Sequence, residues 1–385
     1  MSVTAAAGFE AAGVAAGLKS RGGRDVALVV NRGPRKVGAA VFTGNRAKAN
    51  PVLWSERAVR DGVVEAVVLN SGGANCFTGV FGFQTAHRTA ERAADLLGVS
   101  AGDVLVCSTG LIGTGDQSFR DAVLRGVEDA VPALSREGGD AAAEAIMTTD
   151  TVPKRSQVGR DGWTVGGMAK GAGMLAPGLA TMLVVVTTDA LLEPVDADAA
   201  LRAATRVTFD RLDSDGCMST NDQVTLMASG ASGIRPRTEE FREALTQVCG
   251  DLARQLQADA EGASHDIAIV VEGAVDEDDA VDVGRAVARN ALFKTAVFGN
   301  DPNWGRVLAA IGTTTARFDP YEVDVWMNGV RVCSGGEPDR PRDEVDLTPR
   351  ATRVIVDLKA GEASATILTN DLTHAYVHEN SAYSS

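Results

Sequence analysis

The stretch KGAGMLAPGLATMLVVVTTDA (170–190) places a threonine where a glycine-rich loop runs into an apolar, β-branched segment. Glycine and proline permit backbone conformations that other residues rarely adopt, and the run after Thr181 predicts a rigid, buried strand. A threonine becomes a nucleophile when its own α-amine acts as general base. An internal threonine gains that amine only if the bond before it is cut. The Ala180-Thr181 bond is therefore a candidate for self-cleavage, by attack of the Thr181 hydroxyl on the Ala180 carbonyl.

The chain offers few other general bases. Its four histidines, His87, His265, His374 and His378, are scattered, so their spacing predicts neither a metal cluster nor a Ser-His-Asp triad. A free α-amino group has a pKa of about 7.7–8.0 and is partly neutral at physiological pH, whereas a lysine amine near 10.4 is mostly protonated. The residues alone leave open whether Thr181 is such a nucleophile or an ordinary structural threonine at the start of a strand.

Three weaker motifs favour no other chemistry. STGLIGTGD (108–116) is glycine-rich after a strand, but it lacks the GxGxxG order and the Lys-Ser/Thr of a P-loop. The RxxGxA pattern at 35–40 binds coenzyme A at a helix N-terminus in one acetyltransferase superfamily, but here it runs into a strand. DSDG (213–216) lacks the remaining ligands of a calcium loop.

Charge and cysteine usage exclude several classes of protein. With 37 basic and 51 acidic residues the net charge is -14. This argues against broad binding to nucleic acid or to an anionic membrane, because phosphate contacts need concentrated Lys and Arg. The five cysteines are scattered and form no CxxC pair, which favours reduced thiols over disulfides or a structural zinc site. We therefore expect no metal.

The start of the chain and its hydropathy predict a cytoplasmic protein. The first residues, MSVTAAAGFEAAGVAAGLKSRGG, lack a basic region before the apolar stretch and predict a helix rather than a signal peptide. No run approaches the roughly 18 uninterrupted apolar residues of a membrane-spanning helix.

The elements that must position these residues alternate between strands and helices. Strands are predicted by buried apolar runs, and helices by apolar residues at helical spacing. The expected strands are 25–30, 39–44, 64–70, 104–110, 181–190, 265–275 and the period-two segments 321–336 and 350–372. The expected helices are 83–98, 117–134, 138–147, 196–212, 238–262 and 278–299. The pattern predicts an α/β protein of mixed sheets layered with helices, with candidate boundaries at 150–180 and 335–343.

Segments along the whole chain resemble the ornithine acetyltransferase family, the bifunctional glutamate/ornithine N-acetyltransferases of arginine biosynthesis. KGAGMLAPGLATML (170–183) is similar to the family's KGxGMIxPxMATML signature, which is cleaved at Ala-Thr. Leu175 and Leu179 are conservative apolar replacements within it. The other matching segments are NSGGAN (70–75), STGLIG (108–113), TTDT (148–151), GGMAKGAGM (166–174), STND (219–222), DAEGAS (259–264), GNDPNWGR (299–306) and ENSAYSS (379–385).

The resemblance implies a role for each matching site residue. Thr181 is the implied nucleophile and the N-terminus of a second chain. Thr109, through its hydroxyl, and Gly110, through its backbone N–H, are the implied oxyanion-hole donors. Lys170 would hold the substrate's α-carboxylate, and Glu261 would pair with a substrate amine. The implied substrate-binding set is Thr148, Lys170, Thr181, Glu261, Asn380 and Ser385.

The resemblance also implies the reaction and the assembly. An acetyl group would pass from N-acetylornithine to glutamate through an acetyl-Thr181 ester, with no metal or redox cofactor. The architecture would be the N-terminal-nucleophile type shared with β-peptidyl aminopeptidases, in a heterotetramer of two α chains (1–180) and two β chains (181–385). A departure in NSGGANCFTG, at Gly73, Cys76 and Phe77, would alter a loop near the site.

Several alternatives stay open at this point. A self-processing amidohydrolase or aminopeptidase of the same architecture would carry the same junction, and a non-enzymatic binding protein for small amino acids would keep the chain whole. The sequence does not decide whether acetyl-coenzyme A also serves as donor. It also leaves open whether the enzyme supplies arginine synthesis or a specialised pathway.

Overall fold

The computed structural model describes residues 2–176 and 182–382, and its strands form three sheets. The four-stranded sheet has the order β1-β2-β4-β5, with β1 Phe9–Val14, β2 Val26–Asn31, β4 Ala66–Asn70 and β5 Val104–Ser108. The five-stranded sheet has the order β3-β9-β8-β7-β6, with β3 Val37–Phe42, β9 Gln223–Ala228, β8 Leu183–Thr188, β7 Trp163–Lys170 and β6 Lys154–Arg160. The six-stranded sheet has the order β13-β12-β11-β14-β10-β15, with β13 Glu337–Pro338, β12 Val330–Ser334, β11 Asp324–Met327, β14 Ala351–Asp357, β10 Asp266–Ala274 and β15 Ala363–Asn370.

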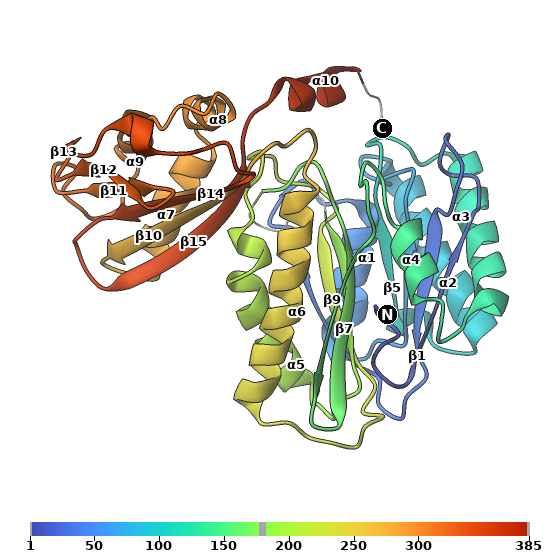
Figure 1. Cartoon of the computed structure of the whole chain (residues 1–385). Helices are drawn as coiled ribbons and strands as arrows, with labels where there is room; N and C mark the ends of the chain where they lie inside the picture. Colours follow the sequence, from blue (N-terminus) through green and yellow to red (C-terminus); the bar gives the residue numbers. More distant parts are fainter. Residues whose placement is uncertain (1, 177–181, 383–385) are drawn as a thin grey trace.

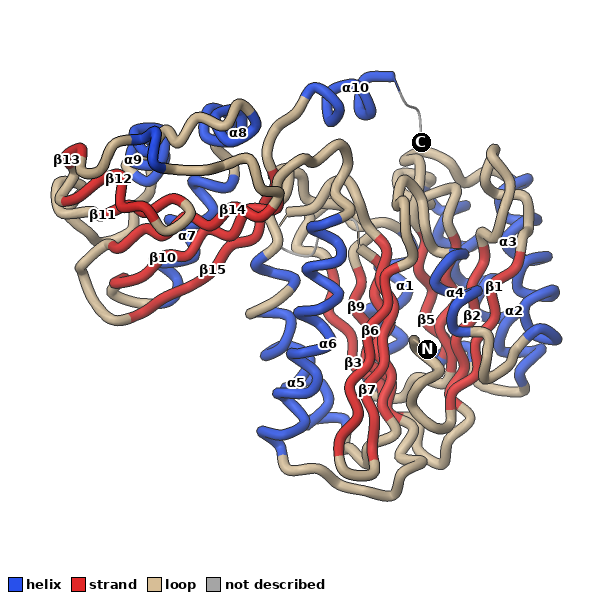
Figure 2. Tube along the Cα trace, viewed as in Figure 1, coloured by secondary structure: helices blue, strands red, loops and turns tan. Residues whose placement is uncertain are grey.

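The four- and five-stranded sheets pack on each other and form the main body of the molecule (Figures 1 and 2). One apolar core lies between them and contains side chains of both sheets, such as Leu69, Leu105, Val185 and Met227. Every residue of β2, β4, β5, β8 and β9 is buried. Strands that are covered on both faces are typically continuous apolar runs, which is why these segments are so rich in Val and Leu.

Helices cover the outer faces of both sheets. Three helices pack against the four-stranded sheet: α1 (Asn50–Ala58), α2 (Gly79–Leu97) and α3 (Gln117–Ala130). The amphipathic helices α5 (Pro194–Arg206) and α6 (Thr238–Ala258) bury their apolar sides against the five-stranded sheet. The short helix α4 (Gly139–Ala145) packs on β1 and contributes to the core between the sheets. The main body therefore has four layers in the order helix, sheet, sheet, helix.

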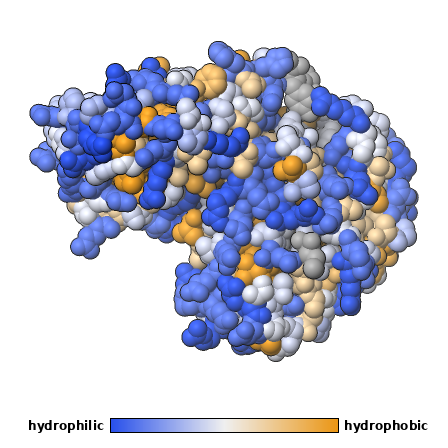
Figure 3. Space-filling view, viewed as in Figure 1, coloured by the Kyte–Doolittle hydropathy of each residue, from blue (hydrophilic) through white to orange (hydrophobic). Residues whose placement is uncertain are grey.

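The six-stranded sheet belongs to a smaller part of the molecule beside the main body (Figure 1). Helices α7 (Glu277–Ala288), α8 (Ala291–Phe298) and α9 (Trp304–Ile311) pack with it around a separate apolar core. After β15 the chain returns towards the main body as α10 (His374–Ala382). The face in Figure 3 is mainly hydrophilic, with apolar residues in small separate groups. No helix in the described part of the chain is long and apolar enough to cross a membrane.

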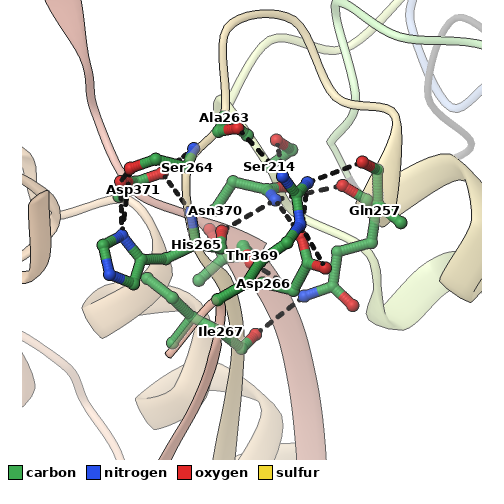
Figure 4. Close-up of polar contacts among 12 residues, drawn as sticks. Ser214, Gln257, Ala263, Ser264, His265, Asp266, Ile267, Thr369, Asn370 and Asp371 are labelled. Atoms are coloured by element: carbon green, nitrogen blue, oxygen red, sulfur yellow. Dashed lines mark hydrogen bonds and ion pairs between the residues drawn. The ribbon is translucent and has the colours of Figure 1, made fainter. Parts of the chain in front are cut away.

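A dense polar cluster joins the smaller part to the main body (Figure 4). The side-chain amide of Asn370 donates to the carbonyl oxygens of Gln257 and His265, both at 3.0 Å. Its Oδ1 accepts from the Ser214 hydroxyl at 2.7 Å. His265 Nδ1 lies 2.7 Å from Asp371 Oδ2, and its Nε2 lies 2.9 Å from the Leu347 carbonyl oxygen. Because both ring nitrogens already face protein oxygens, His265 has a structural role here.

The mixed α/β class with layered helices, predicted from the sequence, is confirmed. The expected helix at the N-terminus is wrong, because Phe9–Val14 forms strand β1 and pairs antiparallel with β2. Alanine has the highest helix propensity, but propensity determines structure only weakly and tertiary pairing overrides it here. The candidate boundary at 150–180 is also wrong for its described part, since β6 and β7 form an antiparallel hairpin there. The expected helix 278–299 is divided by Asn290, whose side chain caps α8 by accepting from the Phe293 N–H.

Candidate active site

One pocket of about 340 Å³ brings together the described residues of the predicted site. It is within the usual size range of small-molecule sites, about 300–1,000 Å³. The predicted residues that line it are Thr109, Gly110, Thr148, Lys170, Glu261 and Asn380. Ala180, Thr181 and Ser385, also predicted for the site, lie outside the described residues.

The pocket lies at a common edge of the two sheets of the main body. Strands β4 and β5 are parallel and end together, at Asn70 and Ser108. Strand β7 ends at Lys170, which pairs with Leu183 at the start of β8. The loops that follow these strand ends carry Thr109 and Gly110 into the pocket. Side chains at the ends of rigid strands are held more exactly than side chains on free loops.

Thr109 and Gly110 are held against the NSGGAN loop. The Thr109 N–H donates to the Asn70 carbonyl, and the Gly73 N–H donates to the Thr109 carbonyl, both at 2.9 Å. Gly110 has a φ of +127°, and a Cβ there would lie 2.5 Å from the Gly73 nitrogen. Only glycine fits this combination of close approach and positive φ. The Gly110 N–H has no acceptor among the described residues, which leaves it available to a ligand.

Lys170 is a buried cation next to Thr109. Its side chain is 1% exposed, and its Nζ donates to the Thr109 hydroxyl oxygen at 3.3 Å. Burial lowers the pKa of Lys170 below its usual value, while the charge of Asp150 acts in the opposite direction. Lys170 and the two predicted oxyanion donors therefore form one polar wall, which suits a carboxylate or a developing oxyanion.

A buried ion network supports this wall from behind. Lys154 Nζ lies 2.6 Å from both Asp150 Oδ1 and Asp259 Oδ2. Asp150 also accepts from the backbone N–H of Thr148 at 2.9 Å and of Gly171 at 2.7 Å. Burial alone would raise the pKa of Asp150, but the charges of Lys170 and Lys154 outweigh it and lower that pKa to about 2. Asp150 thus fixes the backbone on either side of the pocket.

Asp222 holds the start of strand β8. Its Oδ1 accepts from the Met182 N–H at 3.1 Å, and the residue is completely buried. Its Oδ2 is buried without a hydrogen-bond partner in the described part of the chain. Burial raises the pKa of Asp222 well above its usual range, although the Met182 hydrogen bond opposes this. Burial therefore favours the neutral form of this carboxyl group, which lies beside the residue that follows position 181.

Glu261 and Asn380 close the pocket from the other side. The Asn380 side-chain amide donates to Glu261 Oε2 at 3.0 Å. A Cβ on Gly173 would lie 2.5 Å from the same oxygen, so glycine at 173 lets the loop pass close to this carboxylate. Helix α10 carries Asn380, which shows how the returning C-terminal segment reaches the site.

Sequence reasoning missed the polar residues that hold these groups. Asp150, Lys154, Asp222 and Asp259 were assigned no role, although three of them stand in the quoted segments TTDT, STND and DAEGAS. A larger cavity of about 650 Å³ lies between α5, α6 and β15, but it contains none of the predicted residues. Within residues 2–176 and 182–382, no group of three or more His, Cys, Asp and Glu could hold a metal ion.

The layered sheets and the polar pocket define a mixed α/β protein whose site presents hydrogen-bond donors and a buried lysine to a small polar substrate. The chain belongs to the ArgJ family, because the model of that family matches residues 10–385. It is accordingly a bifunctional N-acetyltransferase of arginine biosynthesis.

Individual relatives are similar over their full length. The arginine biosynthesis bifunctional protein ArgJ of Streptomyces coelicolor is 63% identical over 385 residues, which is 100% of both chains. The protein of the same name from Thermobifida fusca is 62% identical over 384 residues, again covering 100% of each. Among solved structures, ornithine acetyltransferase of Mycobacterium tuberculosis complexed with ornithine is 52% identical. That match covers 47% of this chain and 96% of the other, with a TM-score of 0.45.

Proposed function

We propose that the protein transfers an acetyl group from N-acetylornithine to glutamate in two steps, with Thr181 as the nucleophile. The chain is first cut at Ala180-Thr181 into an α chain (1–180) and a β chain (181–385). The new α-amine of Thr181 then takes the proton of its hydroxyl, and Oγ attacks the acetyl carbonyl. Collapse of the tetrahedral intermediate expels ornithine, which takes up that proton. The neutral amine of glutamate attacks the resulting acetyl ester, its proton passes through the α-amine to the departing Thr181 Oγ, and N-acetylglutamate leaves.

The convergence of Thr109, Gly110 and Lys170 in one pocket carries this proposal. The Thr109 hydroxyl and the Gly110 N–H are oriented by the NSGGAN loop and supply two donors for the oxyanion. One such donor is typically worth about 2.7–4 kcal/mol of transition-state stabilisation. Their position at the edge where β8 begins supports Thr181, two residues before Leu183, as the attacking group.

The substrate contacts follow from charge. Lys170 holds the α-carboxylate, and Thr148 adds a polar contact from the same pocket. Glu261, Asn380 and Ser385 hold the side-chain end, with Glu261 facing the ammonium group of ornithine. The acetyl ester must be kept from water, which requires bound substrate to fill the pocket. The active form is an α2β2 heterotetramer located in the cytoplasm.

Intact-mass analysis and a nucleophile variant test the proposal. The wild-type protein should give two fragments that together account for 39.9 kDa, and N-acetylornithine should add one acetyl group to the fragment that starts at Thr181. Thr181→Ala should remain whole and inactive. Thr187→Ala is the control, because Thr187 lies in strand β8 and its hydroxyl donates to the backbone carbonyls of Val3 and Gly166.

Three results would contradict the proposal. An active wild-type protein of a single uncut mass would refute the processing step, and activity in Thr181→Ala would refute the nucleophile. Acetate release that does not depend on glutamate would favour a hydrolase instead. Initial rates measured at several glutamate concentrations should give parallel double-reciprocal plots, whereas intersecting lines would argue against the acetyl ester.

A further inference from the structure

A second cavity, of about 130 Å³, shares Glu261 with the active-site pocket. A single water needs roughly 10–15 Å³ of such space, so the cavity has room for the end of an amino-acid side chain. Its wall is formed by α8, by the loop after β15 and by the segment that begins at Ser214. The two cavities are also linked by Asp215, whose Oδ2 accepts from the N–H of Met174 at 2.8 Å, a residue that lines the first pocket.

Lys294 of α8 is the unusual group in this wall. It is 6% exposed, and a buried charge is normally paired because its transfer out of water is costly. No carboxylate in residues 2–176 and 182–382 forms an ion pair with Lys294. Its Nζ donates to the Ser214 carbonyl oxygen, and an ammonium group has three hydrogens to donate. Lys154, equally buried, instead contacts two carboxylates at 2.6 Å.

The other charged groups of the wall already have partners. Arg289 pairs with Asp213 at 2.7 Å, and Asp371 pairs with His265 at 2.7 Å. Asp215 accepts from the backbone N–H groups of Met174 and Cys217 and lies 3.5 Å from the Tyr376 hydroxyl. Lys294 is thus the buried cation of the described wall that no ion pair neutralises.

We propose that this cavity receives the side-chain end of both amino-acid substrates, and that Lys294 binds the side-chain carboxylate of glutamate. The inference rests on the proposed function and specifies how one site accepts two substrates in turn. The side chain of ornithine ends in an ammonium group, which faces Glu261 and Asp215. The side chain of glutamate ends in a carboxylate, which those two residues would repel. Lys294 supplies the attraction that the acceptor needs.

The test compares glutamate with glutamine, an acceptor of nearly the same shape without the charge. Lys294→Gln keeps a donor for the Ser214 carbonyl and removes the positive charge. The KM for glutamate should rise about 10-fold to 100-fold, the range for a lost hydrogen bond to a charged group. The preference for glutamate over glutamine should fall by a similar factor. The KM for N-acetylornithine, measured from acetyl-enzyme formation followed by mass, should not rise, because the variant removes a positive charge that the ammonium group of this substrate would face.

Two other variants complete the experiment. Lys359→Gln is the matched control, since Lys359 lies outside both cavities and pairs with Asp324 at 2.7 Å. This variant should leave the KM of both substrates unchanged. Asp215 is the carboxylate whose charge acts most strongly on Lys294. Asp215→Asn should therefore lower the KM for glutamate and raise the KM for N-acetylornithine.

The results separate the two proposals. An unchanged preference for glutamate in Lys294→Gln, or an equal loss in both half-reactions, overturns the assignment of Lys294 while the acetyl transfer stands. If Lys294→Gln does not fold, Asp215→Asn decides, and parallel shifts for the two substrates overturn the assignment. A wild-type protein that forms no acetyl-enzyme overturns the proposed function itself.

Discussion

The side-chain amide of Asn221 donates to the carbonyl oxygen of Ser108 at 2.8 Å, and also to that of Ala74 at 2.7 Å. Ser108 is the last residue of β5 and precedes Thr109, while Asn221 precedes the first strand residues of β9. One amide therefore joins the two loops that hold the predicted oxyanion donors, and it does so from the other side of the proposed cut.

Asn221→Asp should disrupt this connection, because it replaces the hydrogen-bond donor with an acceptor. The substitution keeps the shape of the side chain but directs a carboxylate oxygen at two carbonyl oxygens in a buried place. We expect acetyl transfer to fall at least about 100-fold and the free energy of unfolding to fall by about 2–4 kcal/mol. Asn328→Asp is the control, because Asn328 also donates to a carbonyl, of Asp346, but at an exposed turn. Equal effects in the two variants would contradict this role of Asn221.

The buried ion network predicts that Lys154→Met lowers the free energy of unfolding much more than Arg155→Met does. Lys154→Met leaves Asp150 and Asp259 without their shared partner, and breaking such a buried pair typically costs about 3–5 kcal/mol. The neighbouring Arg155→Met removes an exposed pair with Asp140, for which about 0–1 kcal/mol is usual. Urea unfolding measures both. A cost for Lys154→Met no larger than that for Arg155→Met would show that the network does not stabilise the fold.

Gly110→Ala should inactivate the protein through its backbone. A Cβ would lie 2.5 Å from the Gly73 nitrogen, so the loop that presents the Gly110 N–H would have to move. Gly113→Ala provides a matched control, because Gly113 also has a positive φ, of +86°, but a Cβ there meets nothing within 4 Å. We expect about a 100-fold or larger loss of kcat for Gly110→Ala and a small effect for Gly113→Ala. Comparable kcat values would argue against Gly110 as a donor.

Asp222 makes stability depend on pH in a predictable direction. Its raised pKa means that the folded protein binds a proton that the unfolded chain releases above about pH 4. Stability from this group is therefore fully present below that pH and is lost as the pH rises to the folded pKa, by about 1.4 kcal/mol per pH unit. Asp222→Asn keeps an acceptor for the Met182 N–H. Its free energy of unfolding relative to that of the wild type should therefore increase as the pH rises.

Urea unfolding between pH 2 and pH 8 checks this, with Asp116→Asn as the control of opposite sign. The N–H of Phe119 donates to the exposed Asp116, and this hydrogen bond lowers the pKa of Asp116. Its carboxylate contributes stability that develops as the pH rises to about 4 and is constant above that. The stability of the variant relative to the wild type should therefore fall as the pH rises to about 4 and then stay constant. A constant difference between Asp222→Asn and the wild type would mean that Asp222 is ionised in the folded protein.

Local sequence patterns predict much of the fold, but they do not predict which segments far apart in the sequence come into contact. The apolar runs that form β4, β5 and β8 have a composition typical of buried strands. Phe9–Val14 is rich in alanine and becomes a strand only through its pairing with β2. The same holds for the site. Thr109 and Lys170 were predicted from motifs that resemble a family. Lys154 looked like any surface lysine, because its partner Asp259 lies far along the chain.

Strand β8 lies between β7 on one side and β9 on the other, so the five-stranded sheet interleaves residues from before and after position 180. An uncut chain forms this sheet by closing its own loops, a first-order process that dilution does not affect. Two separated pieces would first have to meet, and their renaturation would become second-order and slower at low concentration. If the chain is cut after folding, as we propose, this search is avoided, and the cut protein, once denatured, should regain its structure only at a yield that depends on protein concentration.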